Sequence, residues 1–357
     1  MRDVRKILFE NGVNQYRFRT ILFIALLWAF IDSVVVLTFN TLPGKEKLKP
    51  LLLRETIVFA MSLVMGYLLV VSLKKLFRNY SLWLAYLIKS FILVGAAIIM
   101  YLLLYAVNSV SILGISLESV FARFYYQMFH FNLLLQKTIY WIILFIATQL
   151  ILEINEKYSP GVFLDIFLGK YIHPKTEKRI LMFIDLKDST AIAEKLESKK
   201  YFRFIREFIY QVSTALIEYG GIIYQYVGDE IVVSWHYSRG NIQNCLKALR
   251  ASRRNIQRNS NHFKRRYGFI PEFRVGIHVG FVTVGEIGVI KKDLAMSGDA
   301  MNTTARIRSA TTELKQNVIA SKDFIEKAYL KNGQIKGLGK VELKGKENEV
   351  ELYALNL

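Results

Sequence analysis

The sequence predicts an α-helical membrane domain of about four transmembrane helices, followed by an α+β domain of the ferredoxin-like βαββαβ type. Three observations lead to this fold class. The 357 residues are 53% hydrophobic and only 22% charged, which is more apolar than an ordinary soluble domain. The long apolar stretches all lie within residues 1–152. Residues 176–357 instead alternate between short β-runs and amphipathic helical runs.

Four stretches of the first part are apolar over the length that a bilayer-spanning helix requires, which is about 20 residues. They cover residues 21–39, 56–73, 81–107 and 131–152. The second stretch contains no charged residue, and the other three contain one each: Asp32, Lys89 and Lys137. A carboxylate inside a span is costly, so Asp32 either serves a function or is hydrogen-bonded between packed helices, for example to a Ser or Thr. The second interpretation is the simpler one.

The distribution of positive charge orients these spans. Five basic residues precede the first span and three follow the second, which places both flanks in the cytoplasm. The opposite side would then also contain basic residues, which the positive-inside rule disfavours: Lys45, Lys47, Lys49 and Arg54. An even number of spans returns the chain to the cytoplasm. We therefore expect a multi-pass protein of the inner or plasma membrane, embedded in the lipid bilayer, with its second part cytoplasmic.

Charge and cysteine content limit the partners. The net charge of +19 fits an anionic membrane surface or a polyphosphate substrate as well as it fits nucleic acid, and we do not expect a nucleic-acid partner. The single cysteine, Cys245, excludes an intrachain disulfide and a zinc cluster built from cysteines.

Residues 153–175 are predicted to connect the two parts. The stretch 153–161 is polar and ends in Pro160-Gly161, whereas 162–171 is apolar at helical spacing and is followed by His173-Pro174. A short helix directly after the last span is well placed to transmit motion.

The second part begins with a predicted strand and continues through alternating elements. We expect helices on one face of an antiparallel sheet. The predicted elements are a strand at 179–186, a helix from 188 to 219, strands at 222–226 and 231–235 around a tight hairpin, a basic helix at 241–267, a strand at 273–279 with a hairpin at 280–288, a helix at 298–308, and strands at 341–344 and 350–355.

Two carboxylates stand where these predicted strands end. Asp185 closes the first strand and Asp229 lies in the tip of the adjacent hairpin, so both reach one edge of the sheet. Paired carboxylates suit hard divalent cations such as Mg²⁺, and two such ions can activate an attacking oxygen and neutralise a leaving pyrophosphate. The helix that starts at Ser189 and Thr190 offers free backbone N–H groups to phosphates.

Five ordered motifs make the second part resemble the catalytic domain of class III nucleotidyl cyclases, the adenylate/guanylate cyclase family. They are FIDLKDST at 183–190, YVGDE at 226–230, VGIHVG at 275–280, SGDAMNTTAR at 297–306 and LKGK at 343–346. The resemblance covers about residues 176–357 and keeps the family's order and spacing.

This resemblance implies cyclisation of ATP or GTP to the 3′,5′-cyclic monophosphate with release of pyrophosphate. Asp185 and Asp229 would hold two Mg²⁺ or Mn²⁺ ions per site. Arg306 would stabilise charge on the α-phosphate, Asn302 would orient the ribose, and Lys344 would pair with the terminal phosphates. In this family each site is shared between two chains, so the resemblance also implies a homodimer.

The positions that select the base depart from the family's usual residues. Gln225 stands where members specific for ATP commonly have Lys, and Ala295 stands where they have Asp, Thr or Ser. The guanylate-specific pair, Glu with Cys, is absent as well. We expect ATP as the substrate because it is the more frequent one in the family, and GTP remains the alternative.

Three other functions compete with this interpretation. A catalytically silent sensor would use the fold only for dimerisation, but the presence of all five expected catalytic and metal residues argues against it. A diguanylate cyclase would need Gly-Gly before its acidic pair, where this chain has Val227-Gly228. A transporter would be expected to show internal symmetry among its spans.

Overall fold

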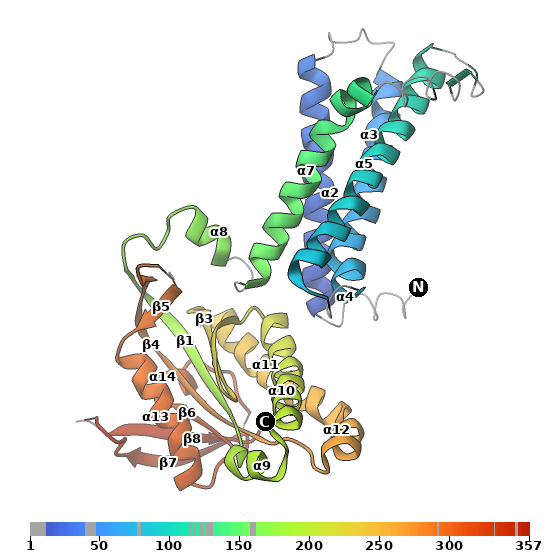
Figure 1. The fold of residues 1–357 in the computed structure, drawn as a ribbon. Coiled ribbons are helices and arrows are strands. Elements are labelled where there is room, and N and C mark those ends of the chain that lie inside the picture. Colours follow the sequence, from blue (N-terminus) through green and yellow to red (C-terminus); the bar gives the residue numbers. More distant parts are fainter. Residues whose placement is uncertain are drawn as a thin grey trace. The chain divides into compact units, whose positions relative to one another are not determined.

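The computed structural model describes residues 12–39, 48–76, 80–113, 131–157, 162–290, 293–331, 333–346 and 349–357, with isolated positions at 116, 119, 120 and 125. The chain divides into two compact units, Asn14–Lys157 and a second unit that contains Tyr158–Leu357. Figure 1 shows the first unit as a group of long helices and the second as a sheet with helices.

The first unit consists of long apolar helices. They are α2 (Gly12–Phe39), α3 (Leu48–Tyr67), α5 (Leu82–Leu113) and α7 (Phe131–Lys157), with α3 continued by a π-helical turn (Leu68–Ser72) and by α4 (Leu73–Leu76). Among the described residues, three helices are long and apolar enough to cross a membrane, over Arg17–Val35, Leu52–Ser72 and Trp83–Ala106. The fourth predicted span is helical, but its apolar part, Ile139–Ile154, is shorter. Four crossings therefore stay a prediction.

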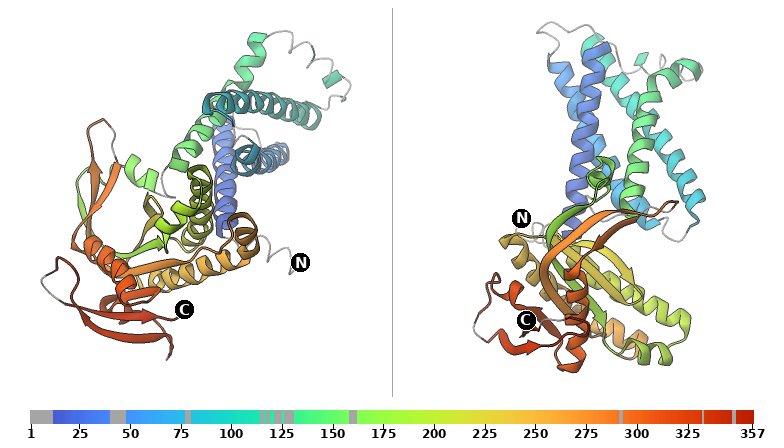
Figure 2. Two further views of the ribbon diagram at one scale, coloured as in Figure 1. Left: turned by 60° about the horizontal axis from the view of Figure 1, so that its bottom comes forward. Right: turned by 90° about the vertical axis from the view of Figure 1, so that its left-hand side faces the viewer.

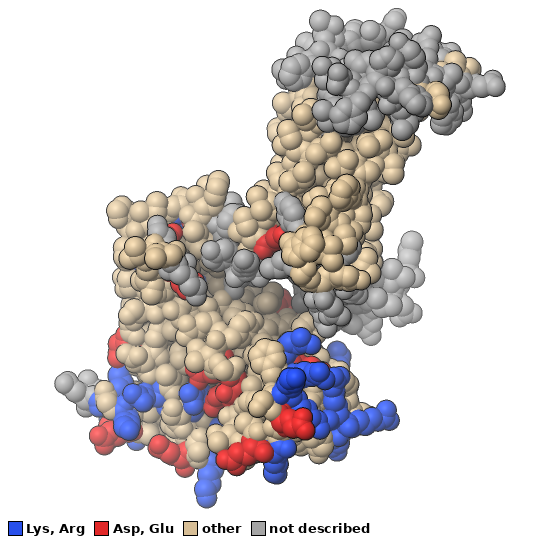
Figure 3. Space-filling view, in the orientation of Figure 1, with Lys and Arg blue, Asp and Glu red and all other residues tan. Residues whose placement is uncertain are grey.

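Large aromatic side chains fill the interior of this unit. Trp28 of α2 stacks on Phe145 of α7 with ring centroids 4.3 Å apart, and its indole Nε1 donates a 2.9 Å hydrogen bond to Thr148. Outward-facing residues are apolar as well: Phe30 and Phe91 are 66% and 71% exposed. The described atoms of these helices are nearly all tan in Figure 3. A bilayer accommodates such a surface, whereas water does not.

Asp32 is fully buried in this unit and joins three helices. The guanidinium of Arg54 in α3 donates to both carboxylate oxygens, at 3.0 and 2.9 Å, and the hydroxyl of Tyr140 in α7 donates at 2.6 Å. The expected hydrogen bonding between packed helices is confirmed, but the partners are Arg54 and Tyr140 rather than a Ser or Thr, because a desolvated carboxylate requires an opposite charge as well as hydrogen bonds. The same pairing compensates the charge of Arg54, one of the four basic residues that count against the predicted orientation.

The second unit is built on an eight-stranded sheet. Its strands are β1 (Lys175–Leu186), β2 (Ile222–Val227), β3 (Glu230–His236), β4 (Phe273–Ile287), β5 (Asp293–Ser297), β6 (Val318–Ser321), β7 (Ile335–Val341) and β8 (Val350–Leu355). The order is β2-β3-β1-β4-β6-β8-β7, with β5 paired to β4. The first four strands are antiparallel neighbours in the ferredoxin-like order, as predicted. Strand β6 joins β4 in parallel, so the complete sheet is mixed.

Helices cover both faces of this sheet. They are α8 (Val162–Phe167), α9 (Ser189–Lys195), α10 (Ser198–Glu218), α11 (Arg239–Arg258), α12 (Ser260–Tyr267), α13 (Asp299–Glu313) and α14 (Lys322–Ile325). Ile180, Met182 and Ile184 of β1 share a core with α10 and α11, whereas Leu181 shares one with Ala300 of α13. The prediction of helices on one face was wrong: residues 179–184 of β1 are buried without alternation, so both faces are covered.

Strand β4 runs unbroken to Ile287, so the hairpin that the sequence predicted at 280–288 forms only after it, where Gly288 has a left-handed backbone with φ of +99° and β5 pairs back on β4. Gly280 and Gly285 serve close packing instead. A Cβ on Gly280 would lie 2.5 Å from the Cβ of Ala300, and one on Gly285 would lie 3.1 Å from Pro174. The β4–β5 ribbon projects beyond the rest of the sheet, as Figure 2 shows. Near its end, Val289 and Ile290 are 93% and 100% exposed.

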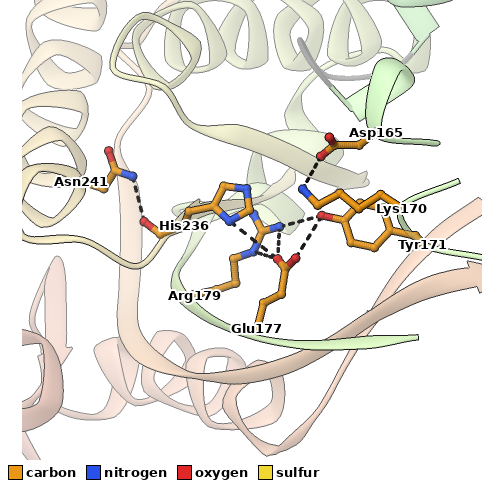
Figure 4. A network of polar contacts seen from close by, with 7 residues as sticks. All are labelled: Asp165, Lys170, Tyr171, Glu177, Arg179, His236 and Asn241. Atoms are coloured by element: carbon orange, nitrogen blue, oxygen red, sulfur yellow. Dashed lines mark hydrogen bonds and ion pairs between the residues drawn. The ribbon is translucent and has the colours of Figure 1, made fainter. Parts of the chain in front are cut away.

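A polar network ties the segment before β1 to the sheet (Figure 4). Arg179 is only 3% exposed and donates to Glu177 at 2.6 Å and to the hydroxyl of Tyr171 at 3.3 Å. Lys170 pairs with Asp165 of α8 at 2.7 Å. Tyr171 is 2% exposed, its hydroxyl contacts both Arg179 and Glu177, and its backbone oxygen accepts from the N–H of Glu286 in β4, so the chain after α8 is held against the sheet rather than left as a free linker.

Candidate active site

Asp185 lies at the end of β1, on the face of the sheet that α13 covers. Its neighbours Ile184 and Leu186 point into the core below α10 and α11, so the alternation of the strand directs Asp185 to the other side. The side chain is 23% exposed. Burial raises the pKa of this carboxyl, Arg308 lowers it, and nearby Asp229 raises it again.

Asp229 is presented by the tight turn between β2 and β3. Val227 and Glu230 pair across this turn, and Gly228 adopts a left-handed backbone with φ of +62°. The Oδ2 atom of Asp229 is buried and has no hydrogen-bond partner among the described residues. Ile184 of β1 pairs with Ile231 of β3, so the end of β1 and the β2–β3 turn lie at the same edge of the sheet, and Asp229 is near enough to raise the pKa of Asp185.

These residues fit a hard divalent cation. Oxygen ligands, a buried carboxylate oxygen without a partner and a second carboxylate beside it are what Mg²⁺ or Mn²⁺ requires, with water or phosphate as the remaining ligands. No group of three or more His, Cys, Asp or Glu side chains suited to a metal occurs within the described part of the chain. Tyr201 at the start of α10 is close as well, since its pKa is raised by burial and by both aspartates.

Two further charged residues of this site were missed by the sequence reasoning. Arg308 of α13 places Nη1 3.3 Å from Oδ2 of Asp185 and Nη2 2.7 Å from Oε2 of Glu230. The sequence contained a sign of this contact. Arg308 follows the buried residues Ala300 and Thr304 at a spacing of four, so it lies on the helix face towards the sheet. A cation on that face requires a carboxylate partner.

Asn302 and Arg306 lie on a different face of α13. Both are exposed, whereas Thr303 and Thr304 between them, and Ile307 directly after Arg306, are buried. Arg306 and Arg308 are two positions apart, which is about 200° around a helix. Arg308 reaches Asp185 of its own chain, so the structure does not bring Asn302 and Arg306 to that aspartate.

The two positions predicted to select the base lie next to a contact between strands. The backbone N–H of Met296 in β5 donates a 3.0 Å hydrogen bond to the hydroxyl of Tyr224 in β2. Gln225 and Ala295 are the immediate neighbours of these two residues. Gln225 is exposed and Ala295 is partly buried, so the glutamine amide is available to a ligand.

The predicted phosphate-binding residues are spread over two regions. Ser189 and Thr190 begin α9, directly after Asp188, which has a left-handed backbone with φ of +57°. Lys344 follows β7 and is exposed. Its neighbour Lys346 contacts Asp299 at 2.8 Å and Thr303 at 2.7 Å, and so anchors this loop to the start of α13.

Comparison with known proteins identifies the family of the domain that carries these residues. The family model of the adenylate and guanylate cyclase catalytic domain matches residues 172–357. This chain belongs to that family. Adenylate cyclase 2 of Rhizobium meliloti (strain 1021) is 29% identical to this chain over 210 residues, which are 57% of this chain and 57% of the relative. An adenylate cyclase of Anabaena cylindrica is 24% identical over 215 residues, 57% of this chain and 42% of the relative. The matches thus span about half the length of these relatives.

The fold of the cyclase domain also occurs in a solved structure. A bacterial light-regulated adenylyl cyclase superposes with a TM-score of 0.52 at 18% identity, over 63% of this chain and 65% of that one. This likeness concerns the fold. The family assignment confirms the predicted class III cyclase domain C-terminal to apolar helices.

Proposed function

We propose that this protein is a membrane-bound adenylate cyclase, which converts ATP to 3′,5′-cyclic AMP and pyrophosphate. The observation that carries the proposal is the meeting of Asp185 and Asp229 at one edge of the sheet, with a buried oxygen of Asp229 left without a partner. Two relatives that bear the name adenylate cyclase support ATP as the substrate.

The aspartates would hold two Mg²⁺ or Mn²⁺ ions. When bound, these ions supply activation of the ribose 3′-hydroxyl and charge neutralisation at the phosphates. The protein's own residues orient the substrate around them: Asn302 positions the ribose, Arg306 donates to the α-phosphate as negative charge develops there, and Lys344 pairs with the terminal phosphates. The backbone at Ser189 and Thr190 faces the phosphates from the start of α9.

The active enzyme would be a homodimer with shared sites. Asn302 and Arg306 are exposed on one side of α13, while Arg308 on another side occupies Asp185 of the same chain. A nucleotide at Asp185 would therefore meet the Asn302 and Arg306 of a second copy. The exposed apolar end of the β4–β5 ribbon is a surface that such a copy would cover.

Guanylate cyclase activity is the second candidate. Gln225 can donate and accept hydrogen bonds, so its exposed amide can pair with adenine or with guanine. Ala295 offers no hydrogen bond to either base. The names of the relatives favour adenine.

The helices of the first unit would anchor the enzyme in the inner or plasma membrane. Three of them have the required length and apolarity, and α7 would be the fourth crossing. With basic flanks inside, this topology places the cyclase domain in the cytoplasm, where ATP is available.

The test is identification of the product. The full chain, purified in lipid nanodiscs, is given ATP or GTP with Mn²⁺, and the cyclic nucleotide is identified by mass spectrometry. Cyclic AMP from ATP at the higher kcat/KM supports the proposal. Cyclic GTP as the main product would favour the guanylate alternative, and no product from either would favour a silent sensor.

A further inference from the structure

An arginine occupies the carboxylate cluster in which the metals are proposed to bind. Arg308 is 28% exposed and bridges Asp185 on β1 to Glu230 on β3, whose side chains are 23% and 15% exposed. Its two terminal nitrogens contact different strands. One cation thus already lies beside an oxygen that a metal would need.

The backbone fixes the position of this arginine. Helix α13 passes so close to β4 that a Cβ on Gly276 would lie 2.5 Å from the backbone N of Arg308. The side chain therefore starts from a fixed point, and its guanidinium can shift between two acceptors. The contact with Glu230, at 2.7 Å, is shorter than the contact with Asp185, at 3.3 Å.

The positive charge of Arg308 affects how strongly this site can bind a metal ion. Asp185 and Glu230 both contact Arg308, and Asp229 directly precedes Glu230, so Arg308 compensates part of the negative charge at this edge of the sheet. Arg274, the other cation that acts on Asp185, is engaged with Thr312 at 3.0 Å and Asp188 at 3.8 Å. A divalent cation and the Arg308 guanidinium would repel each other if both held Asp185.

We propose that Arg308 is a built-in counter-cation of the metal site, which gives up Asp185 to a divalent cation and remains on Glu230. Glu230 is then a positioning residue that receives the arginine, and the Arg308–Glu230 pair sets the affinity of the site for metal. This inference rests on the proposed function, because it takes Asp185 as a metal-binding residue.

Direct measurement of Mn²⁺ binding tests the inference without turnover. The full chain in nanodiscs is titrated with Mn²⁺ in the absence of nucleotide, and free Mn²⁺ is followed by electron paramagnetic resonance. The Mn²⁺ binding that remains in the Asp185→Ala variant does not involve this site, and it is subtracted from each titration. We expect Arg308→Gln to bind Mn²⁺ about tenfold more tightly than wild type, because it removes a positive charge near the site. Arg308→Lys, which keeps the charge, should stay close to wild type.

Glu230→Gln gives an independent second variant. Without its receiving carboxylate the arginine stays on Asp185, so Mn²⁺ binding should weaken about threefold or more. Slow reaction of the buried Cys245 with a thiol reagent verifies that each variant is folded. Should Arg308→Gln fail this check, Arg308→Met takes its place with the same expected result, because Glu230→Gln also removes a negative charge from the site and does not decide alone.

The outcomes separate this inference from the proposed function. Asp185-dependent Mn²⁺ binding that Arg308→Gln leaves unchanged or weakens would overturn the inference and leave the metal assignment intact. No Asp185-dependent binding in any variant would contradict the metal assignment, and the inference with it.

Discussion

Single residues carry the proposed chemistry, and the two aspartates carry most of it. Asp185→Ala and Asp229→Ala should each abolish cyclic nucleotide formation, since each removes a carboxylate from the metal site. Both side chains are partly accessible rather than in the core, so folding should be retained. Activity assays with Mn²⁺, paired with Cys245 protection, check this. Substantial turnover by either folded variant would contradict the assignment.

Gln225 tests how the base is read. Glutamate at this position accepts from the guanine N1 and N2 donors and repels the adenine N1 acceptor, so Gln225→Glu should shift preference from ATP towards GTP. The measurement is the ratio of kcat/KM for the two nucleotides. An unchanged ratio would show that Gln225 does not contact the base.

We expect the stability of the cyclase domain to depend on pH through His278. It is buried in β4 and its Nδ1 lies 2.8 Å from the Ser321 hydroxyl. Burial lowers its pKa from the ordinary value of 6.5. The unfolded chain therefore binds the proton first, so stability is fully present above pH 6.5 and is lost as pH falls through the lower folded pKa.

His278→Gln should flatten this slope, because glutamine keeps a polar partner for Ser321 and does not titrate. The measurement is the rate of Cys245 labelling in mild denaturant between pH 7.5 and pH 5.5. An equal acid-induced rise in labelling for wild type and variant would show that His278 is not responsible.

At the scale of elements, close packing of α13 on β4 fixes the site. Gly276→Ala would place a Cβ 2.5 Å from the backbone of Arg308, and backbone cannot rotate away. We expect a loss of ~1–3 kcal/mol in the free energy of unfolding, together with reduced activity. Gly240→Ala in α11 is the matched control, since its Cβ would meet only Ser238 Oγ, at 4.0 Å. Equal stability of the two variants would refute the packing argument.

Local patterns predicted most elements, and tertiary packing decided the rest. The order βαββαβ and the carboxylates at its edge followed from alternation and turn residues around Asp185 and Asp229. The hairpin predicted at 280–288 was placed too early, because glycines that permit a turn also permit close packing: Gly280 packs against Ala300 and Gly285 against Pro174, and the turn follows Ile287. Strand β6 and helix α14 were not predicted, since four-residue elements have too little periodicity to be detected.

Long-range pairing of charges could not be read from the sequence. Arg54 and Asp32 are 22 positions apart and Arg308 and Asp185 are 123 apart, so only the folded chain reveals each pair. In both cases the sequence showed only that a charged residue, Asp32 or Arg308, lies on a buried helix face and so requires a partner of opposite charge. The predicted transmembrane segments rested on composition alone and did not need such contacts.

At the scale of the whole molecule, the central claim is that two chains share each active site. Asp185→Ala and Arg306→Ala homodimers should each be inactive, because every site then lacks one essential group. In a mixed dimer, one of the two shared sites contains both substitutions, and the other site contains only wild-type residues.

Co-expression of these two variants, with separate tags to recover mixed dimers, is the most direct test. Random mixing makes about half of the dimers mixed, each with one intact site, so cyclic AMP formation should return to roughly a quarter of the wild-type rate. Purified mixed dimers should reach about half of it. Mixed dimers that are recovered but form no cyclic AMP would show that Asp185 and Arg306 act within one chain, and would contradict the shared site.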